Sequence, residues 1–197
     1  MPRQVDHESR RRLIAEAVCH LADERGLEGV TLRDVAARAQ VSMGAVQRCF
    51  RTKEEMLVFA LGHIGERIGE RVRARLVRSP AQSAGTALGH AVTEISLLQE
   101  EHRAEARVWL AFVAQAAVSE ALARTLKVNY AALHEAFTRL LAEARENAGR
   151  AAPLDPQREA RTLLALADGL TTHVLIGHLT PREAHDVLHA HLAGLWE

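Results

Sequence analysis

The sequence predicts an all-α protein of about nine helices, with a three-helix domain over residues 1–52 and a larger helical domain over residues 53–197. Three observations predict this fold. No segment alternates β-branched and polar residues over the length of a strand, whereas the strong helix formers Ala, Leu, Arg and Glu dominate. Ser, Thr or Asp repeatedly precedes an apolar run with helical spacing, as an N-cap does. Apolar residues make up 48% of the 197 residues, enough to bury a core.

The first predicted helix runs from about residue 9 to residue 25. Gly26 follows it, and glycine readily adopts the left-handed conformation found just after a helix end. Apolar residues recur along one side of this helix, and we expect that side to pack against the next two helices. These residues are Leu13, Ala17, Val18 and Leu21.

Residues 31–53 predict two short helices joined by a tight turn. Thr31 is placed to cap the first helix, and Asp34, three residues later, would complete a capping box. Ser42 is placed to cap the second helix. Thr52 to Glu55 forms another capping box, so a further helix is expected to begin almost at once.

The second short helix, over residues 43–50, predicts one buried and one exposed side. Val46 and Phe50 are four residues apart and therefore face inward together. The opposite side presents small and polar side chains, as a helix that enters a groove requires. Helix, tight turn and helix in this order is the layout of the helix-turn-helix unit that reads DNA.

The charge around these helices favours the same interpretation. The whole chain is neutral, with 25 Lys and Arg, 25 Asp and Glu and a pI near 7.2, which predicts no general affinity for polyanions. Between residues 33 and 53 the only acid is Asp34, and a local positive patch suits contact with DNA phosphates. A solvated charged face is the alternative, and the helix-turn-helix spacing decides against it. The cations of this patch are Arg33, Arg38, Arg48, Arg51 and Lys53.

Six further helices are predicted after this unit. Helix starts are marked by Ser79 with Pro80, by Asp155 with Pro156, and by the capping box from Thr180 to Glu183. The predicted ranges are 53–77, 81–100, 103–117, 119–147, 156–178 and 181–197.

The helix over residues 156–178 is apolar on most sides, and the last helix has a similar surplus of apolar residues. Pairing both with their copies in a second chain would bury these surfaces as a four-helix interface, so we predict a homodimer. Full burial within one monomer is the alternative.

Gly62, Gly65 and Gly69 share one face of the helix over residues 53–77. Glycine inside a helix costs about 0.5–1 kcal/mol relative to alanine, so these three residues call for an explanation. Either another backbone approaches closely, or the helix bends there as a hinge.

Polar or aromatic residues on otherwise apolar helices are candidates for a ligand pocket in the larger domain. Asp168 is the most specific of them, because a buried carboxylate needs a partner, either a cationic ligand or an internal Arg or His. The candidates are Phe59, His63, Glu94, Trp109, Phe112, Gln115, Tyr130, His134, Asp168, Thr171 and Thr172.

Over residues 8–57 the pattern resembles the tetracycline-repressor (TetR) family of bacterial transcriptional regulators. Two positions depart from the family pattern: Gln47 stands where tyrosine is usual, and Cys49 where histidine is frequent. Gln47 is suited instead to a bidentate contact with an adenine edge. The resemblance is carried by Gly26, by the segments 30–36, 41–46 and 52–57, and by Phe50.

The resemblance implies a repressor that binds a pseudo-palindromic double-stranded DNA operator as a homodimer and leaves it when a small-molecule effector enters the larger domain. It implies no cofactor and no enzymatic activity. The residues expected to meet the DNA backbone are Thr31, Ser42, Gln47, Arg48, Thr52 and Lys53. Those expected nearest the base edges are Arg33, Met43, Ala45 and Gln47.

A helical enzyme and an adaptor that binds only protein are the rival interpretations. No histidine has a glutamate three residues before it, which argues against a di-iron bundle, and no phosphate-binding loop is present. His185 and His189 have the spacing of metal ligands but lack an evident third ligand, so we expect no metal site. No apolar run approaches about 20 residues, and two cysteines make no disulfide framework, so we expect a cytoplasmic protein without membrane contact.

Overall fold

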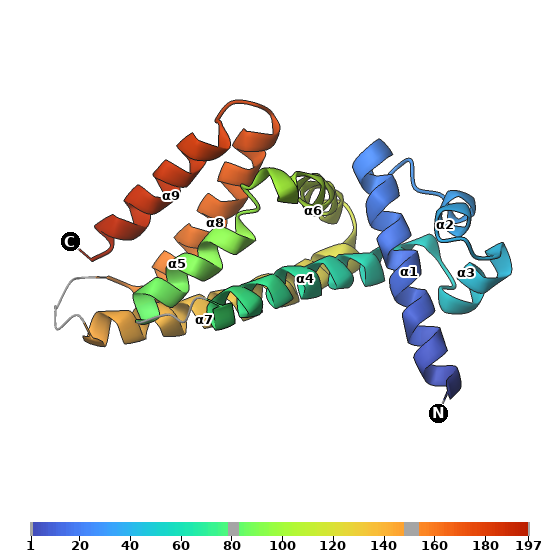
Figure 1. The fold of residues 1–197 in the computed structure, drawn as a ribbon, viewed down its shortest axis with the longest axis horizontal. Coiled ribbons are helices and arrows are strands. Elements are labelled where there is room, and N and C mark those ends of the chain that lie inside the picture. The colour runs from blue at the N-terminus through green and yellow to red at the C-terminus, as the bar shows by residue number, and fades with distance from the viewer. Residues whose placement is uncertain (1, 79–82, 148–153, 197) are drawn as a thin grey trace. The chain divides into compact units, whose positions relative to one another are not determined.

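The computed structural model describes residues 2–78, 83–147 and 154–196. These residues form nine α-helices and one short 3₁₀ helix, with no strand among them (Figure 1). The chain packs into two compact units, one of Met1–Glu66 with Arg107–Lys127 and the other of Arg67–Ala106 with Val128–Glu197. All-α architecture is confirmed.

The division by packing differs from a boundary at residue 53, because three helices contribute to both units. α4 (Lys53–Arg78), α6 (Arg103–Ala116) and α7 (Glu120–Asn147) each begin in one unit and end in the other. That residues 1–52 form the DNA-binding domain stays a prediction.

The first unit contains α1 (Pro2–Arg25), α2 (Leu32–Arg38) and α3 (Met43–Cys49), and each of these three helices contacts the other two (Figure 1). Two helices of seven residues are too short to be stable alone in water, so their stability comes from packing. The side chains that bury completely here are apolar and come from every element: Ile14, Val18, Val35, Val46, Phe50 and Met56.

α1 ends as the sequence predicts. Gly26 has φ +72°, and its amide donates a hydrogen bond to the Ala22 carbonyl at 2.9 Å, which closes the helix. The helix begins at Pro2 rather than near residue 9. The inward placement of Leu13 is wrong, since Leu13 is 52% exposed; Ile14, one residue or about 100° further round the helix, fills the core instead.

The predicted N-caps of α2, α3 and α4 are confirmed, but two predicted capping boxes are not closed as expected. Thr31 Oγ1 accepts a hydrogen bond from the Asp34 amide at 3.1 Å and donates one to the Asp34 carboxylate at 2.8 Å. The Asp34 carboxylate does not bind the Thr31 amide, as a closed box requires, because aspartate is one methylene shorter than glutamate. The Glu55 carboxylate accepts from the Arg51 amide, whereas a closed capping box would use the amide of Thr52. Ser42 caps α3 through the Ala45 amide at 3.1 Å.

Phe50 anchors the first unit from the end of α3. Its ring lies 5.4 Å from the ring of Phe59 on α4, and the Arg11 guanidinium lies over both rings, at 5.0 Å and 4.2 Å from their centroids. A cation over two aromatic faces adds an electrostatic attraction to the apolar packing. α1, α3 and α4 are joined at this point.

The inner ridge of α4 is apolar, and Leu57, Leu61, Ile64 and Ile68 are all buried. A methyl group added at Gly62 would meet no atom within 4 Å, and one at Gly69 would meet only the flexible end of Arg73. Among the described residues, no other backbone approaches these two glycines closely, and the hinge stays a prediction.

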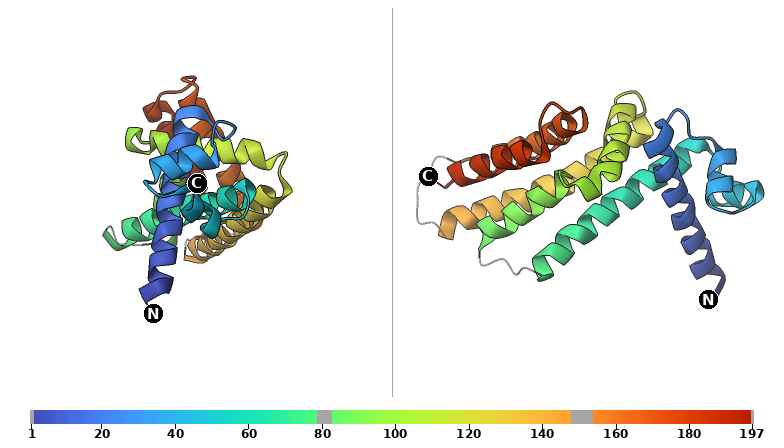
Figure 2. Two further views of the ribbon diagram at one scale, coloured as in Figure 1. Left: turned by 90° about the vertical axis from the view of Figure 1, so that its right-hand side faces the viewer. Right: turned by 45° about the horizontal axis from the view of Figure 1, so that its top comes forward.

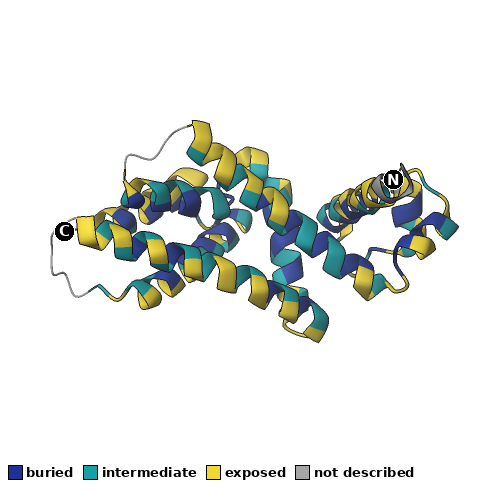
Figure 3. Cartoon of the chain, turned by 90° about the horizontal axis from the view of Figure 1, so that it is seen from below, coloured by how far each residue is buried: buried dark blue, intermediate teal, exposed yellow. Residues whose placement is uncertain are grey.

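The second unit contains α5 (Ala84–Ile95), the 3₁₀ helix η1 (Glu100–His102), α8 (Pro156–Leu175) and α9 (Pro181–Gly194), with the remaining parts of α4, α6 and α7. α8 lies against both α5 and α9 (Figure 2). Buried residues line the inward sides of the helices and exposed residues the outward sides (Figure 3). Phe137, Leu141, Leu163 and Leu188 are among the fully buried core residues of this unit.

Two predicted helix ends in this unit are wrong. α5 stops at Ile95 rather than residue 100, because Leu97 takes the left-handed conformation with φ +48° and a 3₁₀ turn follows. α8 stops at Leu175 rather than His178, because Gly177 has φ +75°. The predicted N-cap Ser79 lies outside the described residues, and Ser83 caps α5.

The predicted caps of α8 and α9 are confirmed. Asp155 accepts from the amides of Gln157 and Arg158, with Pro156 in the first helical position. Thr180 and Glu183 form a complete capping box. The Thr180 amide and hydroxyl, both donating to the Glu183 carboxylate, lower the pKa of that carboxyl from its usual value.

Replacing Phe50 with alanine tests the anchoring of α3. We expect Phe50→Ala to lower the free energy of unfolding by about 3–5 kcal/mol, because a fully buried ring is lost and leaves a cavity. Leu13→Ala, at an exposed position of α1, should change it by about 0.5 kcal/mol or less. Urea denaturation followed by circular dichroism measures both, and equal losses would contradict the described packing.

Candidate nucleic-acid interface

α3 presents a narrow polar surface whose orientation is set by its buried side. Val46 is fully buried, which turns Gln47 and Arg48 to the solvent, and Met43 at the start of the helix is 40% exposed. Because residues four apart share a face, Met43 and Gln47 lie together. This surface has the size and polarity that a major-groove contact requires.

Ala45 does not belong to this surface. Its side chain is 7% exposed and faces the interior, while its amide is used by the Ser42 cap. The placement of Ala45 near a base edge is therefore wrong, because position 45 adjoins the buried Val46 rather than the outer face. Gly44, which sequence analysis did not single out, lies on the outer side next to Met43 and allows close approach of a partner.

The five cations of the patch are not equivalent. Arg33, Arg48 and Arg51 are exposed and form no ion pair with any described residue. Lys53 is half-buried, and its Nζ donates to the backbone carbonyl of Glu28 at 3.4 Å, which leaves its charge uncompensated. Positive charge on this surface is available to phosphates.

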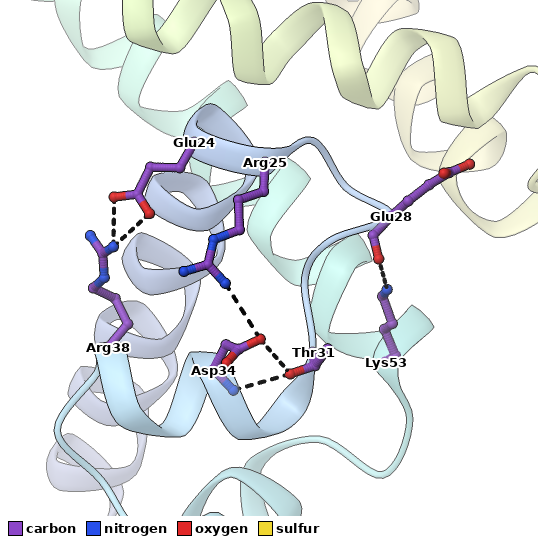
Figure 4. A network of polar contacts seen from close by, with 7 residues as sticks. All are labelled: Glu24, Arg25, Glu28, Thr31, Asp34, Arg38 and Lys53. Atoms are coloured by element: carbon purple, nitrogen blue, oxygen red, sulfur yellow. Dashed lines mark hydrogen bonds and ion pairs between the residues drawn. The ribbon is translucent and has the colours of Figure 1, made fainter.

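Arg38 has a structural role instead. Its Nη2 donates to both carboxylate oxygens of Glu24, at 2.6 and 2.7 Å, and so ties α2 to the end of α1 (Figure 4). This hydrogen-bonded guanidinium holds the pKa of the Glu24 carboxyl below its usual value of 4.5. The Arg25 guanidinium lies 3.8 Å from the Asp34 carboxylate nearby.

The hydroxyl groups predicted to contact the DNA backbone are all exposed, but their protons are not equally available to a phosphate. Ser42 and Thr52 accept an amide in their caps, and their hydroxyl protons remain available to a phosphate. Thr31 already donates its proton to Asp34, so a phosphate contact from Thr31 requires that bond to break.

The ligand-pocket candidates fall in both units. In the first unit, Phe59 packs against Phe50, and Phe112 and Trp109 are buried core residues, at 0% and 9% exposure. His63 is nearly buried and lies 4.0 Å from the Glu16 carboxylate. Gln115 is half-buried on α6.

In the second unit, three candidates gather at one place. Tyr130 donates to the Asp168 carboxylate at 2.5 Å, so this carboxylate has an internal partner of a kind that the sequence did not predict. With His134 they line a shallow groove of about 380 Å³ between α7 and α8. The Thr171 hydroxyl shares its proton between the carbonyls of Ser96 and Ala167, and Thr172 donates to the Asp168 carbonyl; all three bonds are made to helix backbone or a helix end.

Glu94 belongs to an ion cluster that sequence analysis missed. Its carboxylate faces Arg71 on α4, which also binds Glu105 on α6 at 2.6 Å. One feature of the sequence could have indicated this cluster: Arg71 follows Ile68 by three residues and therefore lies on the inner side of α4. Its partners come from other helices and could not be read from spacing.

His185 and His189 lie ring against ring at 4.2 Å on α9. The described residues contain no group of three or more His, Cys, Asp or Glu side chains that could hold a metal ion. Cys49 is buried and unpaired, and Cys19 is half-buried. Across the described ranges, no helix is long and apolar enough to cross a membrane.

Comparison with known proteins decides what this arrangement is. Residues 14–58 match the family described as bacterial regulatory proteins, tetR family, and residues 84–197 match the BetI-type transcriptional repressor C-terminal family. The chain is 33% identical over 178 residues to the HTH-type transcriptional regulator PksA of Bacillus subtilis, covering 89% of this chain and 83% of PksA.

The chain belongs to the TetR family of bacterial transcriptional regulators. It is also 33% identical over 172 residues to the regulator BetI of Burkholderia mallei, covering 86% of this chain and 84% of BetI. A transcriptional regulator from Rhodococcus shares its fold with a TM-score of 0.81 and 29% identity, over 94% of this chain and 95% of that one.

Membership of this family makes the chain a DNA-binding repressor of the helix-turn-helix type, and not an enzyme. Regulators of this family bind DNA operators and act as dimers. The exposed surface of α3 is therefore the candidate DNA-contact surface of this regulator.

The ion pair between Arg38 and Glu24 predicts a pH-dependent difference in stability. Because the folded pKa of Glu24 is lowered, the pair's contribution is fully present above about pH 4.5 and is lost as the pH falls through the lower, folded pKa. We expect wild type to be more stable than Arg38→Gln at pH 7 and pH 5, with a difference that shrinks toward zero below pH 4.

Urea denaturation at a series of pH values measures this difference. Arg48→Gln is the matched control, since Arg48 forms no ion pair with a described residue and its difference from wild type should not depend on pH. A wild-type advantage over Arg38→Gln that grows as the pH falls would contradict the assignment.

Proposed function

We propose that this regulator reads a pseudo-palindromic operator with the exposed surface of α3 and holds it with the surrounding cations and hydroxyls. The support is the exposure of Met43, Gln47 and Arg48 on a helix held from behind by Val46 and Phe50. Arg33, also exposed, extends the reading surface from α2. The remaining contacts go to the DNA backbone and come from Ser42, Arg48, Thr52, Lys53 and, once released from Asp34, Thr31.

Gln47 is the main reader of sequence in this proposal. A glutamine amide offers one donor and one acceptor, which match the N6 and N7 positions of adenine in the major groove. Gln47 is exposed near the end of α3 and its side chain forms no hydrogen bond to a described residue, so its amide is available. An adenine is therefore expected at the contacted step of each half-site.

The dimer forms, in our proposal, through the outer faces of α8 and α9. These two helices lie against each other, and their outer faces carry small or apolar exposed residues. Val187 on α9 is 45% exposed, Ile176 directly after α8 is 70% exposed, and the exposed residues Ala165, Ala190 and Ala193 allow helices to approach closely. A two-fold dimer of a helix-turn-helix regulator reads two half-sites about 34 Å apart, which is the operator spacing we expect.

The regulator responds, in our proposal, to a small molecule bound in its second unit, and acts in the cytoplasm where operator DNA is found. Two observations support an effector there. The BetI-type C-terminal match covers residues 84–197, and a structurally similar regulator from Saccharomonospora viridis, 22% identical with a TM-score of 0.81, was solved in complex with choline. The ligand-pocket candidates of this unit are Glu94, Tyr130, His134, Asp168, Thr171 and Thr172.

Two substitutions separate recognition of the base sequence from contact with the DNA backbone. Lys53→Ala should weaken binding to all DNA and reduce the slope of log affinity against log salt by about 1, because one phosphate contact is lost. Gln47→Ala should cost about 1–3 kcal/mol on the operator and little on scrambled DNA. Mobility-shift titrations at several salt concentrations measure both, and an equal loss on both DNAs for Gln47→Ala would refute this division.

A charge placed on the outer face of α9 tests the dimer. Ala190→Arg should convert the dimer to monomers and weaken operator binding by about tenfold or more, because a buried unpaired charge opposes association. Val128→Arg is the matched control, since Val128 is 69% exposed on α7. Sedimentation velocity gives the oligomeric state, and an intact Ala190→Arg dimer would exclude this interface.

A further inference from the structure

Arg71 lies where α4, α5 and α6 meet in the second unit. Its Nη1 binds Glu105 Oε2 at 2.6 Å, whereas the nearest oxygen of Glu94 is 3.8 Å from its Nε, too far for a hydrogen bond. The three side chains are only 24%, 9% and 13% exposed for Arg71, Glu105 and Glu94. This cluster is therefore an ion group largely removed from water.

The cluster leaves three buried polar atoms without a hydrogen bond to any described residue: Arg71 Nε, Arg71 Nη2 and Glu105 Oε1. Glu105 Oε1 lies 3.6 Å from Arg67 Nε, within the range of an ion pair but beyond a hydrogen bond. Buried polar atoms are almost always paired, so three unpaired ones at one place need an explanation.

The unpaired atoms of Arg71 form one side of its guanidinium. Nε and Nη2 point their N–H bonds in parallel, with the spacing of the two oxygens of a carboxylate. Glu94 faces this side but does not reach it. A purely structural ion pair would be expected to close these hydrogen bonds, because a buried charge gains most from complete pairing. The side is therefore suited to a carboxylate that the protein does not itself supply.

Charge balance restricts the ligand further. Arg67 and Arg71 are balanced by Glu94 and Glu105, so a ligand with net charge would leave an uncompensated charge in a largely buried place. The open acceptor, Glu105 Oε1, belongs to the same carboxylate that already binds Arg71. A positive donor that meets Oε1 must therefore lie close to the ligand's own carboxylate.

We propose that the effector of this regulator is an α-amino acid or an equally compact zwitterion. Its carboxylate binds the Nε and Nη2 side of Arg71, displacing Glu94, and its ammonium donates to Glu105 Oε1. This inference rests on the proposed function, in which a small molecule in the second unit weakens operator binding. Arg71 lies on α4, which is continuous from Lys53, so the ligand changes the contacts of the helix that begins beside the DNA-reading surface.

Thermal unfolding of the full-length protein with each common L-amino acid provides the first test. At least one amino acid should raise the unfolding midpoint by about 3 °C or more, because a ligand that binds only the folded state stabilises it. The amide of that amino acid, which lacks the carboxylate, and the corresponding acid without the amino group should each bind about tenfold more weakly or worse by calorimetry.

Arg71→Lys and Arg73→Lys form the matched pair of variants. Arg71→Lys keeps the charge but removes the two-donor side, so affinity for the amino acid should fall about tenfold or more. Arg73→Lys should keep affinity within about threefold, because Arg73 is exposed on α4 and forms no ion pair with a described residue. If Arg71→Lys does not fold, Glu105→Gln, which removes the negative acceptor, should show the same loss.

The outcomes separate this inference from the proposed function. If no amino acid binds, or if both lysine variants bind equally well, the inference is overturned even where operator binding is intact. If an amino acid binds through Arg71 but leaves operator affinity unchanged in mobility-shift assays, the ligand site stands and its role as an effector site is refuted.

Discussion

Burial of Val46 and Phe50 is the constraint on which the rest of the first unit depends. α2 and α3 have seven residues each and could not remain helical in isolation. They persist because Phe50 packs against Phe59, with Arg11 over both rings, while Val46 packs inward. The same burial fixes the rotation of α3, so the exposure of Gln47 follows from the apolar residues behind it.

The cations of the first unit fall into two groups. Arg33, Arg48 and Arg51 are exposed and form no ion pair with a described residue. Arg38 is used within the protein, where it joins α2 to α1 through Glu24. Within this unit, two further polar contacts join the segment 107–127 to α1 and α4: Arg107 binds Asp23, and Ser119 donates to Glu54. Since α6 and α7 continue from that segment into the second unit, they and α4 are the helices that the two units share.

Local chemistry made most helix starts predictable, because a cap needs only a few neighbouring residues. Gly26, Ser42, Asp155 and the box from Thr180 to Glu183 all act as their residue types suggest. Rotation about a helix axis was less predictable, since a step of one residue turns a side chain by about 100°, and Leu13 and Ala45 were misplaced for this reason. The cluster around Arg71 was missed because three separate helices assemble it.

In the proposed complex, α3 enters the major groove of an operator. Methylation interference on the DNA flanking the gene of this regulator tests this placement, because methylation of guanine N7 blocks the major groove whereas methylation of adenine N3 blocks the minor groove. With α3 in the major groove, interference is expected at guanine N7 in two clusters about one helical turn apart. Interference confined to adenine N3, or no salt-sensitive complex with this DNA, would rule out this placement of α3.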